Sequence, residues 1–284
     1  MTEFGLYLPQ VGLGFGQIVE AASAAASFGF RHIWFIDHFE IPGYAGVMEG
    51  WTVATAVAAA VPGIRVGHLM LCAGVRHPSL LGKMAATLDR ISDGRLDLGL
   101  GWGSSPEELR AFGVSTEPGA TRRAKLVETI AIVRSMLTGG EIDFEGEHYT
   151  VRATCSGPTA VQSPVPLFIG GTGPATMELV RDYADWWNCP SAGRKDLSTL
   201  VPAAGRARVS ANYSLAIEDE SSGTVRLSGR PYAPVLLGGP AAIADALVAD
   251  GALGVELFNI QFVRIGQLMQ QMETFMGEVA PAVA

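Results

Sequence analysis

The sequence is poor in cysteine, and its three cysteines form no recognisable pair. Cys72, Cys155 and Cys189 lie far apart, and none belongs to a C-x-x-C motif. This spacing argues against a disulfide framework and against a cysteine-based zinc site, and it favours a reducing, cytoplasmic compartment. We therefore expect the three thiols to be small buried apolar groups, and we expect no metal ion.

Positive charge and long apolar runs are also scarce. The chain has 20 Lys and Arg against 28 Asp and Glu, which gives a formal net charge of −8. No basic block is long enough for a nucleic-acid footprint, so we expect no nucleic-acid partner. No apolar run approaches membrane-spanning length, and the start MTEFGLYLPQ has neither a basic region nor a long apolar core. We therefore expect no membrane segment and no signal peptide.

What the chain has in abundance is apolar sequence arranged in alternating segments. Its 284 residues are 48% hydrophobic and 17% charged, which is typical of a globular protein with a large core. Apolar, strand-like segments are expected at residues 4–8, 33–36, 64–71, 96–100, 166–169, 186–189, 212–217 and 254–260. Helix-like segments are expected at residues 17–28, 51–61, 79–91, 106–112, 121–137, 175–184, 240–250 and 265–279.

These segments make about eight strand–helix pairs, the arithmetic of a (β/α)₈ TIM-type barrel. We therefore predict an α/β fold in which residues 1–284 form a single barrel domain. An open doubly wound sheet is the alternative, but no G-x-G-x-x-G follows the first strand. The segment EIDFEGEHYTV predicts a hairpin, a short insertion after the fourth βα unit. The pattern of residues 194–230 does not place elements.

The stretch HIWFIDH, residues 32–38, runs from an apolar strand into an acid and an imidazole. Four large apolar residues in a row indicate a strand that is buried on both faces. In a barrel, Asp37 and His38 would follow the carboxyl end of the second strand, where active sites of this fold lie. The alternative is an Asp that caps a turn beside an exposed His. For a single acid–His pair the two interpretations weigh about equally.

Two glycine-rich loops each follow an apolar strand and lead into a helix. They lie in LGLGWGSSPEELRAFG, residues 98–113, and in PLFIGGTGPATMEL, residues 166–179. Backbone N–H groups at a helix N-terminus bind anions, and glycine allows close approach, so the pair suggests a ligand that carries phosphate. Each loop is also typical of an ordinary helix with proline in its first turn. Glu107 and Glu108 weaken the anion interpretation of the first loop.

Five segments occur in an order that is typical of one enzyme superfamily. They are FGLYLPQ, GFRHIWFIDHF, RHPSLLGKMAATLDRISDGRLDLGLGWG, ELRAFG and PLFIGGTGPATMELVRDYADWWN. They resemble the signature segments of the luciferase-like flavin and deazaflavin oxidoreductases, and the resemblance covers nearly the whole chain in the right order. The second and fifth segments look closer to the branch that uses coenzyme F420. The resemblance implies a TIM-type barrel that binds F420, or alternatively FMN, in its mouth.

Residue roles follow from the same resemblance. It implies that His38 is an acid/base group tuned by Asp37, and that residues 69–72 form a bulge, often with a non-prolyl cis peptide, under the cofactor ring. The residues that match the family's cofactor contacts are Asp37, Leu69, Met70, Cys72, Gly101, Trp102, Gly103, Gly171, Thr172 and Gly173. Candidates for an apolar substrate pocket are Phe39, Met48 and Trp51.

The sequence departs from the family at one informative position. The sugar-phosphate dehydrogenases of this family carry a Glu in the turn after the fourth strand, where this chain has Ser104. This difference puts a glucose-6-phosphate-type activity in doubt.

Three functions compete on this evidence. The first is an F420-dependent oxidoreductase that transfers a hydride between the deazaflavin and a small, mostly apolar organic substrate. The second is a two-component FMN monooxygenase that uses O₂, and the third is a flavin-binding relative without catalysis. The first is favoured, with a homodimer as the expected assembly. The identity of the substrate does not follow from the sequence.

Overall fold

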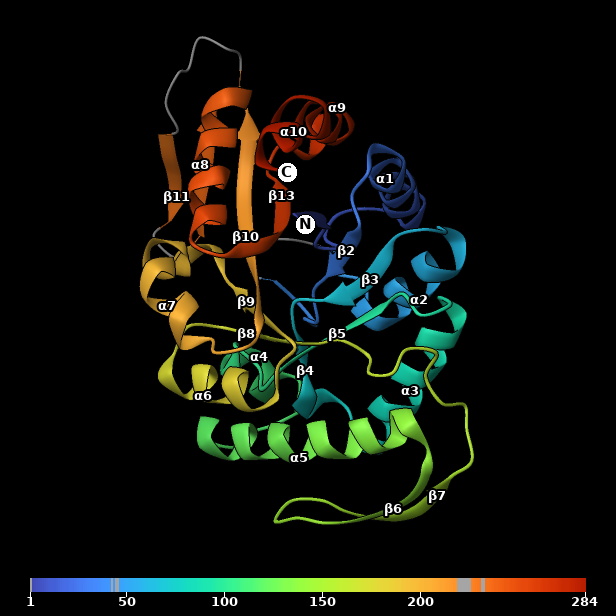
Figure 1. Cartoon of the computed structure of the whole chain (residues 1–284). Helices are drawn as coiled ribbons and strands as arrows, with labels where there is room; N and C mark the ends of the chain where they lie inside the picture. The colour runs from blue at the N-terminus through green and yellow to red at the C-terminus, as the bar shows by residue number, and fades with distance from the viewer. Residues whose placement is uncertain (1, 42, 44–45, 219–225, 231–232) are drawn as a thin grey trace. The chain divides into compact units, whose positions relative to one another are not determined.

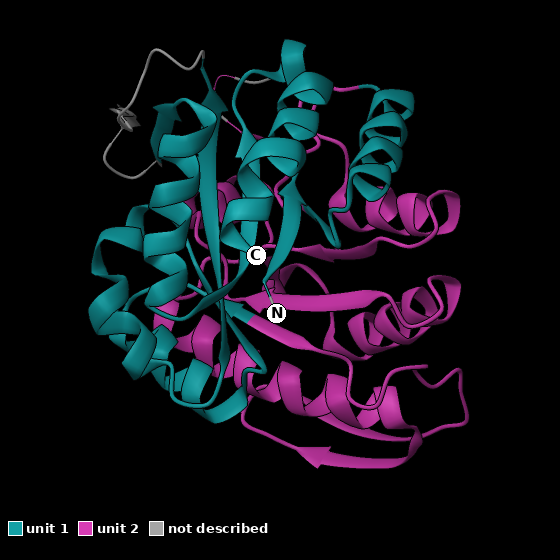
Figure 2. Cartoon of the chain, turned by 45° about the horizontal axis from the view of Figure 1, so that its top comes forward, with its two compact units in different colours: residues 1–9, 14–34, 169–284 teal, residues 10–13, 35–168 magenta. Residues whose placement is uncertain are grey.

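The computed structural model describes residues 2–41, 43, 46–218, 226–230 and 233–284, with 226–230 and 233 described by their backbone alone (Figure 1). The chain divides into two compact units (Figure 2). Unit 1 comprises residues 1–9, 14–34 and 169–284, and unit 2 comprises residues 10–13 and 35–168. The single domain expected for residues 1–284 stays a prediction.

Unit 1 is built on a run of parallel strands. Neighbours pair in the order β9, β10, β13, β1 and β2. Their bounds are β1 Glu3–Tyr7, β2 His32–Phe35, β9 Trp186–Cys189, β10 Arg208–Ile217 and β13 Val255–Phe262. Every residue of β2 and β9 is buried, as expected for parallel strands that are covered on both faces.

Further strands lie at residues where the sequence pattern predicted no strand. Strand β12, Ala233–Gly238, pairs in parallel with β10, and β11, Arg226–Arg230, pairs antiparallel with β12. A short helix of the same region, α7, carries Pro202 inside its seven residues, which hides its helical pattern. Strand β8, Leu167–Gly170, lies at the sequence boundary between the two units.

The helices of unit 1 largely follow the predicted segments. They are α1 Phe15–Phe28, α6 Pro174–Tyr183, η2 Ser191–Asp196, α7 Leu197–Ala203, α8 Pro240–Ala252, η3 Ile265–Gln267, α9 Leu268–Thr274, the π-helical η4 Phe275–Val279 and α10 Ala280–Val283. Helix α1 ends at Gly29, whose φ of 105° is left-handed and favours glycine. The segment predicted as one helix, 265–279, is divided into 3₁₀, α and π turns. Gly266 and Gly277 lower its helical propensity.

Unit 2 contains a strand that is interrupted. Strands β3, Arg65–His68, and β4, Leu71–Cys72, both pair in parallel with β5, Leu96–Gly101. The sequence predicted one strand over 64–71, but the chain breaks at the Leu69–Met70 peptide bond, which is cis. The neighbouring strand accommodates the break only with glycine at position 99, because a Cβ there would collide with the carbonyl oxygen of His68.

The helices of unit 2 begin and end close to the predicted residues. They are α2 Gly50–Ala60, η1 Ala73–Val75, α3 Pro78–Ile91, α4 Pro106–Ala111 and α5 Gly119–Thr138. The expected hairpin is confirmed as β6, Gly140–Glu145, paired with β7, Thr150–Cys155. It runs beside α5 and packs Ile142 and Phe144 against Ile132 and Met136 of that helix (Figure 1).

Three further observations concern the expectations that came from composition. The thiols of all three cysteines are free and buried, as predicted. No helix in the described part of the chain is long and apolar enough to cross a membrane. Within those same residues, His, Cys, Asp and Glu side chains do not gather in groups of three or more that could hold a metal ion.

Candidate functional site

Asp37 follows β2 and is bound on both of its oxygens. Its Oδ2 accepts hydrogen bonds from the backbone N of Cys72 at 2.7 Å and from Arg76 Nη1 at 2.8 Å. Its Oδ1 accepts from Arg76 Nη2 at 2.8 Å. The two side chains are buried, so this bidentate pair is poorly screened and geometrically specific. Asp37 therefore fixes the segment that follows the interrupted strand.

Arg76 extends this connection to a second helix. Its Nη2 also donates to Glu49 Oε1 at 2.6 Å, and Glu49 caps α2 by accepting from the backbone N of Trp51 and Thr52. Burial lowers the pKa of the Arg76 guanidinium, but its hydrogen bonds and ion pairs with Asp37 and Glu49 outweigh burial and raise it. The sequence had marked Arg76 only as part of the RHP signature.

His38 has an acidic partner that sequence reasoning did not identify. Its Nδ1 lies 2.7 Å from Oε2 of Glu108. The other oxygen, Oε1, accepts from the backbone N of Phe39 at 2.6 Å and of Glu40 at 3.1 Å. The His38 side chain is 32% exposed and that of Glu108 only 11%. One carboxylate thus holds both the imidazole and the backbone of its loop.

Two sequence expectations change with this geometry. The negative charge of Glu108 was expected to weaken an anion site at the start of α4. In the structure its carboxylate contacts His38, and Glu107 is exposed. Asp37 was expected to tune His38, but its carboxylate is drawn to Cys72 and Arg76. No local sequence signal could join positions 38 and 108, because they become neighbours only through the fold.

The bulge segment, residues 69–72, and the turn after β5 lie together. The cis bond falls within the bulge at residues 69–72. A Cβ at Gly101 would touch the Met70 side chain at 3.4 Å, and one at Gly103 would lie 2.9 Å from Cys72 Sγ. The φ of Gly103 is also positive, at 86°, so both sterics and backbone require glycine there. The carbonyl of Trp102 accepts from Arg122 Nε at 3.1 Å.

The three substrate-pocket candidates lie in different environments. Phe39 is exposed and stacks on Phe112, with ring centroids 4.7 Å apart. Met48 is half-buried, whereas Trp51 is buried and stacks on His68 at 5.7 Å. Burial lowers the pKa of the fully buried His68, which keeps its ring neutral. Phe39, which follows His38 in the chain, therefore forms with Phe112 an aromatic pair that solvent reaches.

The second glycine loop belongs to unit 1 and precedes α6. Gly171 has a φ of 127°, donates its N–H to Asn188 O at 3.2 Å, and accepts from Trp187 Nε1 at 2.8 Å. Gly173 is the N-cap of α6, where no side chain caps the helix and a Cβ would meet nothing within 4 Å. No side chain caps this helix end and the space at Gly173 is open, which suits an anion such as a phosphate.

Comparisons with known proteins agree with the family resemblance of the sequence segments. The model of the luciferase-like monooxygenase family matches residues 2–216. A curated F420-dependent glucose-6-phosphate dehydrogenase of Nakamurella multipartita is 31% identical over 208 residues, which are 70% of this chain. The chain spans only 60% of the length of that relative.

Solved structures confirm the predicted fold class, a (β/α)₈ barrel. The coenzyme F420-dependent tetrahydromethanopterin reductase of Methanopyrus kandleri matches with a TM-score of 0.85 and 18% identity, over 100% of this chain and 99% of that one. The monooxygenase RslO1 of Streptomyces bottropensis matches with a TM-score of 0.80 and 22% identity, over 99% and 100%. A reductase and a monooxygenase share the architecture, so the fold alone does not select a reaction.

Proposed function

Since the chain belongs to the luciferase-like monooxygenase family, we propose that it is a coenzyme F420-dependent oxidoreductase that transfers a hydride between the deazaflavin and a small, mostly apolar organic substrate. The observation that carries the proposal is the His38–Glu108 pair, which lies next in sequence to the Asp37 that anchors the bulge. The named relative at 31% identity supports F420 as the cofactor.

Residues of each unit, considered separately, suit a part of a deazaflavin. In unit 2, the glycines at 101 and 103 bring the turn after β5 against Met70 and Cys72 of the bulge. In unit 1, the uncapped N-terminus of α6 behind Gly173 suits the phosphate of a cofactor side chain. When bound, a deazaflavin supplies hydride transfer, because its ring has a carbon where a flavin has N5.

His38 would move the proton that accompanies the hydride. A carboxylate only accepts hydrogen bonds, so the contact with Glu108 places the proton of a neutral imidazole on Nδ1. The lone pair is then on Nε2, which can take a proton from a substrate hydroxyl and return it in the reverse direction. Glu108 is a positioning residue in this scheme, because it acts through the imidazole.

Asp37 and Arg76 would position the cofactor ring rather than handle protons. Both Asp37 oxygens are engaged, and one of them holds the backbone of Cys72 directly after the bulge. Arg76, which binds Asp37, also donates to Glu49, the residue that caps α2. A direct contact between Asp37 and the cofactor stays a prediction.

The substrate would be small and mostly apolar on one side. The exposed Phe39–Phe112 stack offers an apolar aromatic surface, and Phe39 follows His38 in the chain. Ser104 is exposed and carries no charge where sugar-phosphate dehydrogenases of the family have a Glu. The glucose-6-phosphate activity named for the relative is therefore not carried over to this chain.

Cofactor titration tests the proposal and separates it from its rivals. The purified protein is titrated with F420 and with FMN while cofactor fluorescence and absorption are recorded. Tighter binding of F420, followed by its bleaching with one of a panel of small alcohols, is expected. Micromolar binding of FMN with none of F420 would favour the two-component monooxygenase. Binding of a cofactor without turnover of any alcohol, carbonyl or O₂ would favour the non-catalytic relative.

A homodimer is proposed from the outer face of α2 and α3. On α3, Leu80 and Ile91 are large exposed apolar side chains, and Met84 and Thr87 lie between them at helical spacing. On α2, the exposed Thr52, Ala59 and Ala60 carry no charge. An uncharged face of this kind is typical of an interface that a second copy covers. The cytoplasmic location stays a prediction.

A further inference from the structure

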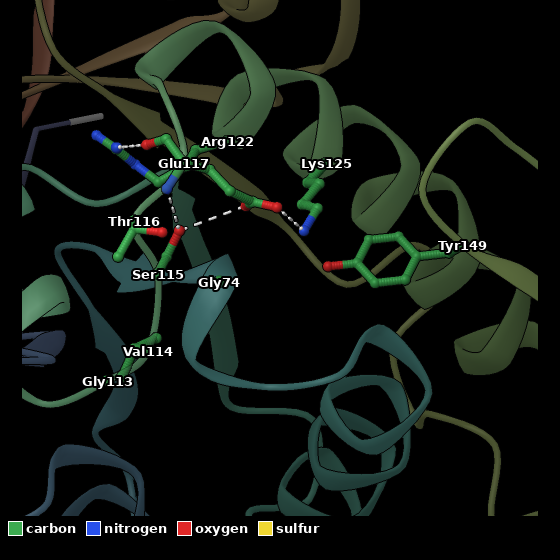
Figure 3. Close-up of a pocket in the computed structure, with 9 residues that line it drawn as sticks. All are labelled: Gly74, Gly113, Val114, Ser115, Thr116, Glu117, Arg122, Lys125 and Tyr149. Carbon is green, nitrogen blue, oxygen red and sulfur yellow. Dashed lines mark hydrogen bonds and ion pairs between the residues drawn. The ribbon is translucent and has the colours of Figure 1, made fainter.

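Unit 2 contains a cavity of about 300 Å³ beside the start of α5 (Figure 3). It is lined by Gly74 of η1, by residues 113–117, by Arg122 and Lys125 of α5, and by Tyr149 near the hairpin turn. Of these residues, only Gly113 belongs to a segment that carries the family resemblance, as the last residue of ELRAFG. None of them has a part in the proposed proton transfer.

The cavity carries more positive than negative charge. Lys125 Nζ lies 2.5 Å from Glu117 Oε1, so these two charges compensate each other. Arg122 donates to two backbone carbonyls, Trp102 O at 3.1 Å and Glu117 O at 2.6 Å. Among the residues that the structure describes, Arg122 has no carboxylate partner. One guanidinium charge of the cavity therefore has no counter-ion.

Hydroxyl donors complete the lining. Figure 3 shows the hydroxyl of Tyr149 directed toward the Lys125–Glu117 pair. Burial raises the pKa of the Tyr149 phenol, so it keeps its proton and can donate a hydrogen bond at neutral pH. Ser115 Oγ lies 3.3 Å from Glu117 Oε2 and accepts from the backbone N of Glu117 at 3.1 Å. A phenol, a serine hydroxyl and two cations are donors that oxyanions prefer.

Glu117 occupies the place that an incoming anion would take. Its side chain is 36% exposed and that of Lys125 is 27% exposed, and ion pairs with this much solvent contact add little to stability. An anion that binds Lys125 can therefore displace Glu117 at small cost. The displaced carboxylate can turn into solvent.

We propose that this cavity binds a small oxyanion, a carboxylate or a phosphate group, through Lys125, Arg122 and the Tyr149 hydroxyl. The oxyanion belongs either to a separate small molecule, in which case the site goes beyond the proposed function, or to an acidic side chain of the cofactor, in which case the site rests on that function. The second source is compatible with the position of the cavity, since Arg122 holds Trp102 of the β5 turn and Gly74 follows the bulge.

Two substitutions that break the same ion pair test the site in opposite directions. Inorganic phosphate and glutarate are titrated by calorimetry into the wild-type protein, Lys125→Gln, Glu117→Gln and the control Arg110→Gln. Lys125→Gln should weaken binding by roughly tenfold or more, because a charged donor is lost. Glu117→Gln should tighten binding several-fold, because Lys125 is released and a repulsive carboxylate is removed. Arg110, an exposed guanidinium on α4 outside the cavity, should have no effect.

Coenzyme F420 and its chromophore without the phosphate side chain are titrated into the same four proteins. Free-anion affinities that follow the expected order assign the cavity to a separate ligand. If the free anions do not bind, but F420 follows the order and the bare chromophore does not, the oxyanion is the cofactor's. The proposal is overturned if no probe distinguishes the variants, or if Glu117→Gln weakens binding as Lys125→Gln does. The phosphate and glutarate arms stay informative even if the protein binds no F420.

Discussion

The Nδ1 atom of His38 lies 2.7 Å from Oε2 of Glu108, a residue 70 positions later in the chain. The second oxygen of the same carboxylate holds the backbone N–H groups of Phe39 and Glu40. The acid therefore sets both the tautomer of the ring and the position of the loop that carries it. An amide in its place would keep the shape of the side chain but could donate to Nδ1, which would move the imidazole proton to Nε2.

The Glu108→Gln variant should therefore lower kcat by roughly 10–10³-fold and change the pH dependence of kcat, with cofactor affinity nearly unchanged. The measurement is the pH–rate profile of F420 reduction, together with F420 titration. Glu107→Gln, the exposed neighbour in the same helical turn, is the matched control and should behave as wild type. Equal profiles for the two variants would remove Glu108 from the mechanism.

The His38→Ala variant removes the proton-handling group itself. Turnover should fall on the order of 10²–10⁴-fold, the usual contribution of a positioned acid/base group, while the fold and F420 binding are retained. Steady-state kinetics, circular dichroism and cofactor titration measure the three quantities. His148→Ala, which changes a half-buried imidazole in the hairpin turn, serves as the control. Turnover near the wild-type rate in His38→Ala would leave the site without its proposed base.

Local sequence patterns predicted the elements because they are short-range properties. The apolar run of β9 was placed at its observed bounds, Trp186–Cys189, and α3 begins one residue before its expected start, at Pro78. Apolar periodicity and the first-turn proline are each sufficient to mark such boundaries. Residues 64–71 were predicted as one continuous strand. The interruption depends on the space that Gly99 leaves beside His68, and Gly99 belongs to the neighbouring strand β5, so the local pattern does not reveal it.

The partners of the candidate site were beyond sequence reasoning for a related reason. The carboxylates of Asp37 and Glu108 were both visible, but which one faces His38 depends on how α4 and the loop after β2 pack. Arg76 lies 39 positions from Asp37, and its bidentate geometry decides the orientation of that acid. The resemblance supplied the location of the bulge but not these side-chain contacts.

The buried His68 makes stability depend on pH. Its folded-state pKa lies below the ordinary value of about 6.5, so as the pH falls the unfolded chain takes up a proton before the folded protein does. Stability should therefore be greatest above about pH 6.5 and decline below it, by up to about 1.4 kcal/mol per pH unit. A His68→Phe variant keeps an aromatic ring against Trp51 and should flatten the fall in Tm between pH 7.5 and 5.5. An unchanged slope would show that His68 does not titrate in this range.

A substitution at Gly173 tests the proposed phosphate site at α6 without disturbing the fold. A side chain at this position would meet no protein atom within 4 Å, and its backbone φ of −67° is accessible to any residue. The Gly173→Val variant should therefore keep its Tm but weaken F420 binding by roughly tenfold, by obstructing the approach of a phosphate to the helix N-terminus. Gly16→Val, which changes a glycine in the first turn of α1 that likewise has no neighbour within 4 Å, should leave F420 affinity unchanged. A loss of Tm without a loss of affinity would point to a purely structural glycine.

If the face formed by α2 and α3 is the dimer interface, a charge introduced there should prevent dimer formation. Leu80 is 55% exposed and Ile91 is 44% exposed, on a stripe whose neighbouring basic residues, Lys83 and Arg90, turn aside to the carbonyls of Gly157 and Thr159. Leu80→Glu would place a carboxylate in the proposed interface, where desolvation of the charge opposes association. Light scattering coupled to gel filtration should then give a mass near twice 29.9 kDa for the wild type and near 29.9 kDa for the variant. Val248→Glu changes a side chain of 45% exposure on α8 and should leave the dimer intact. A dimer that survives Leu80→Glu would have to use another surface, because a carboxylate is not buried without a partner.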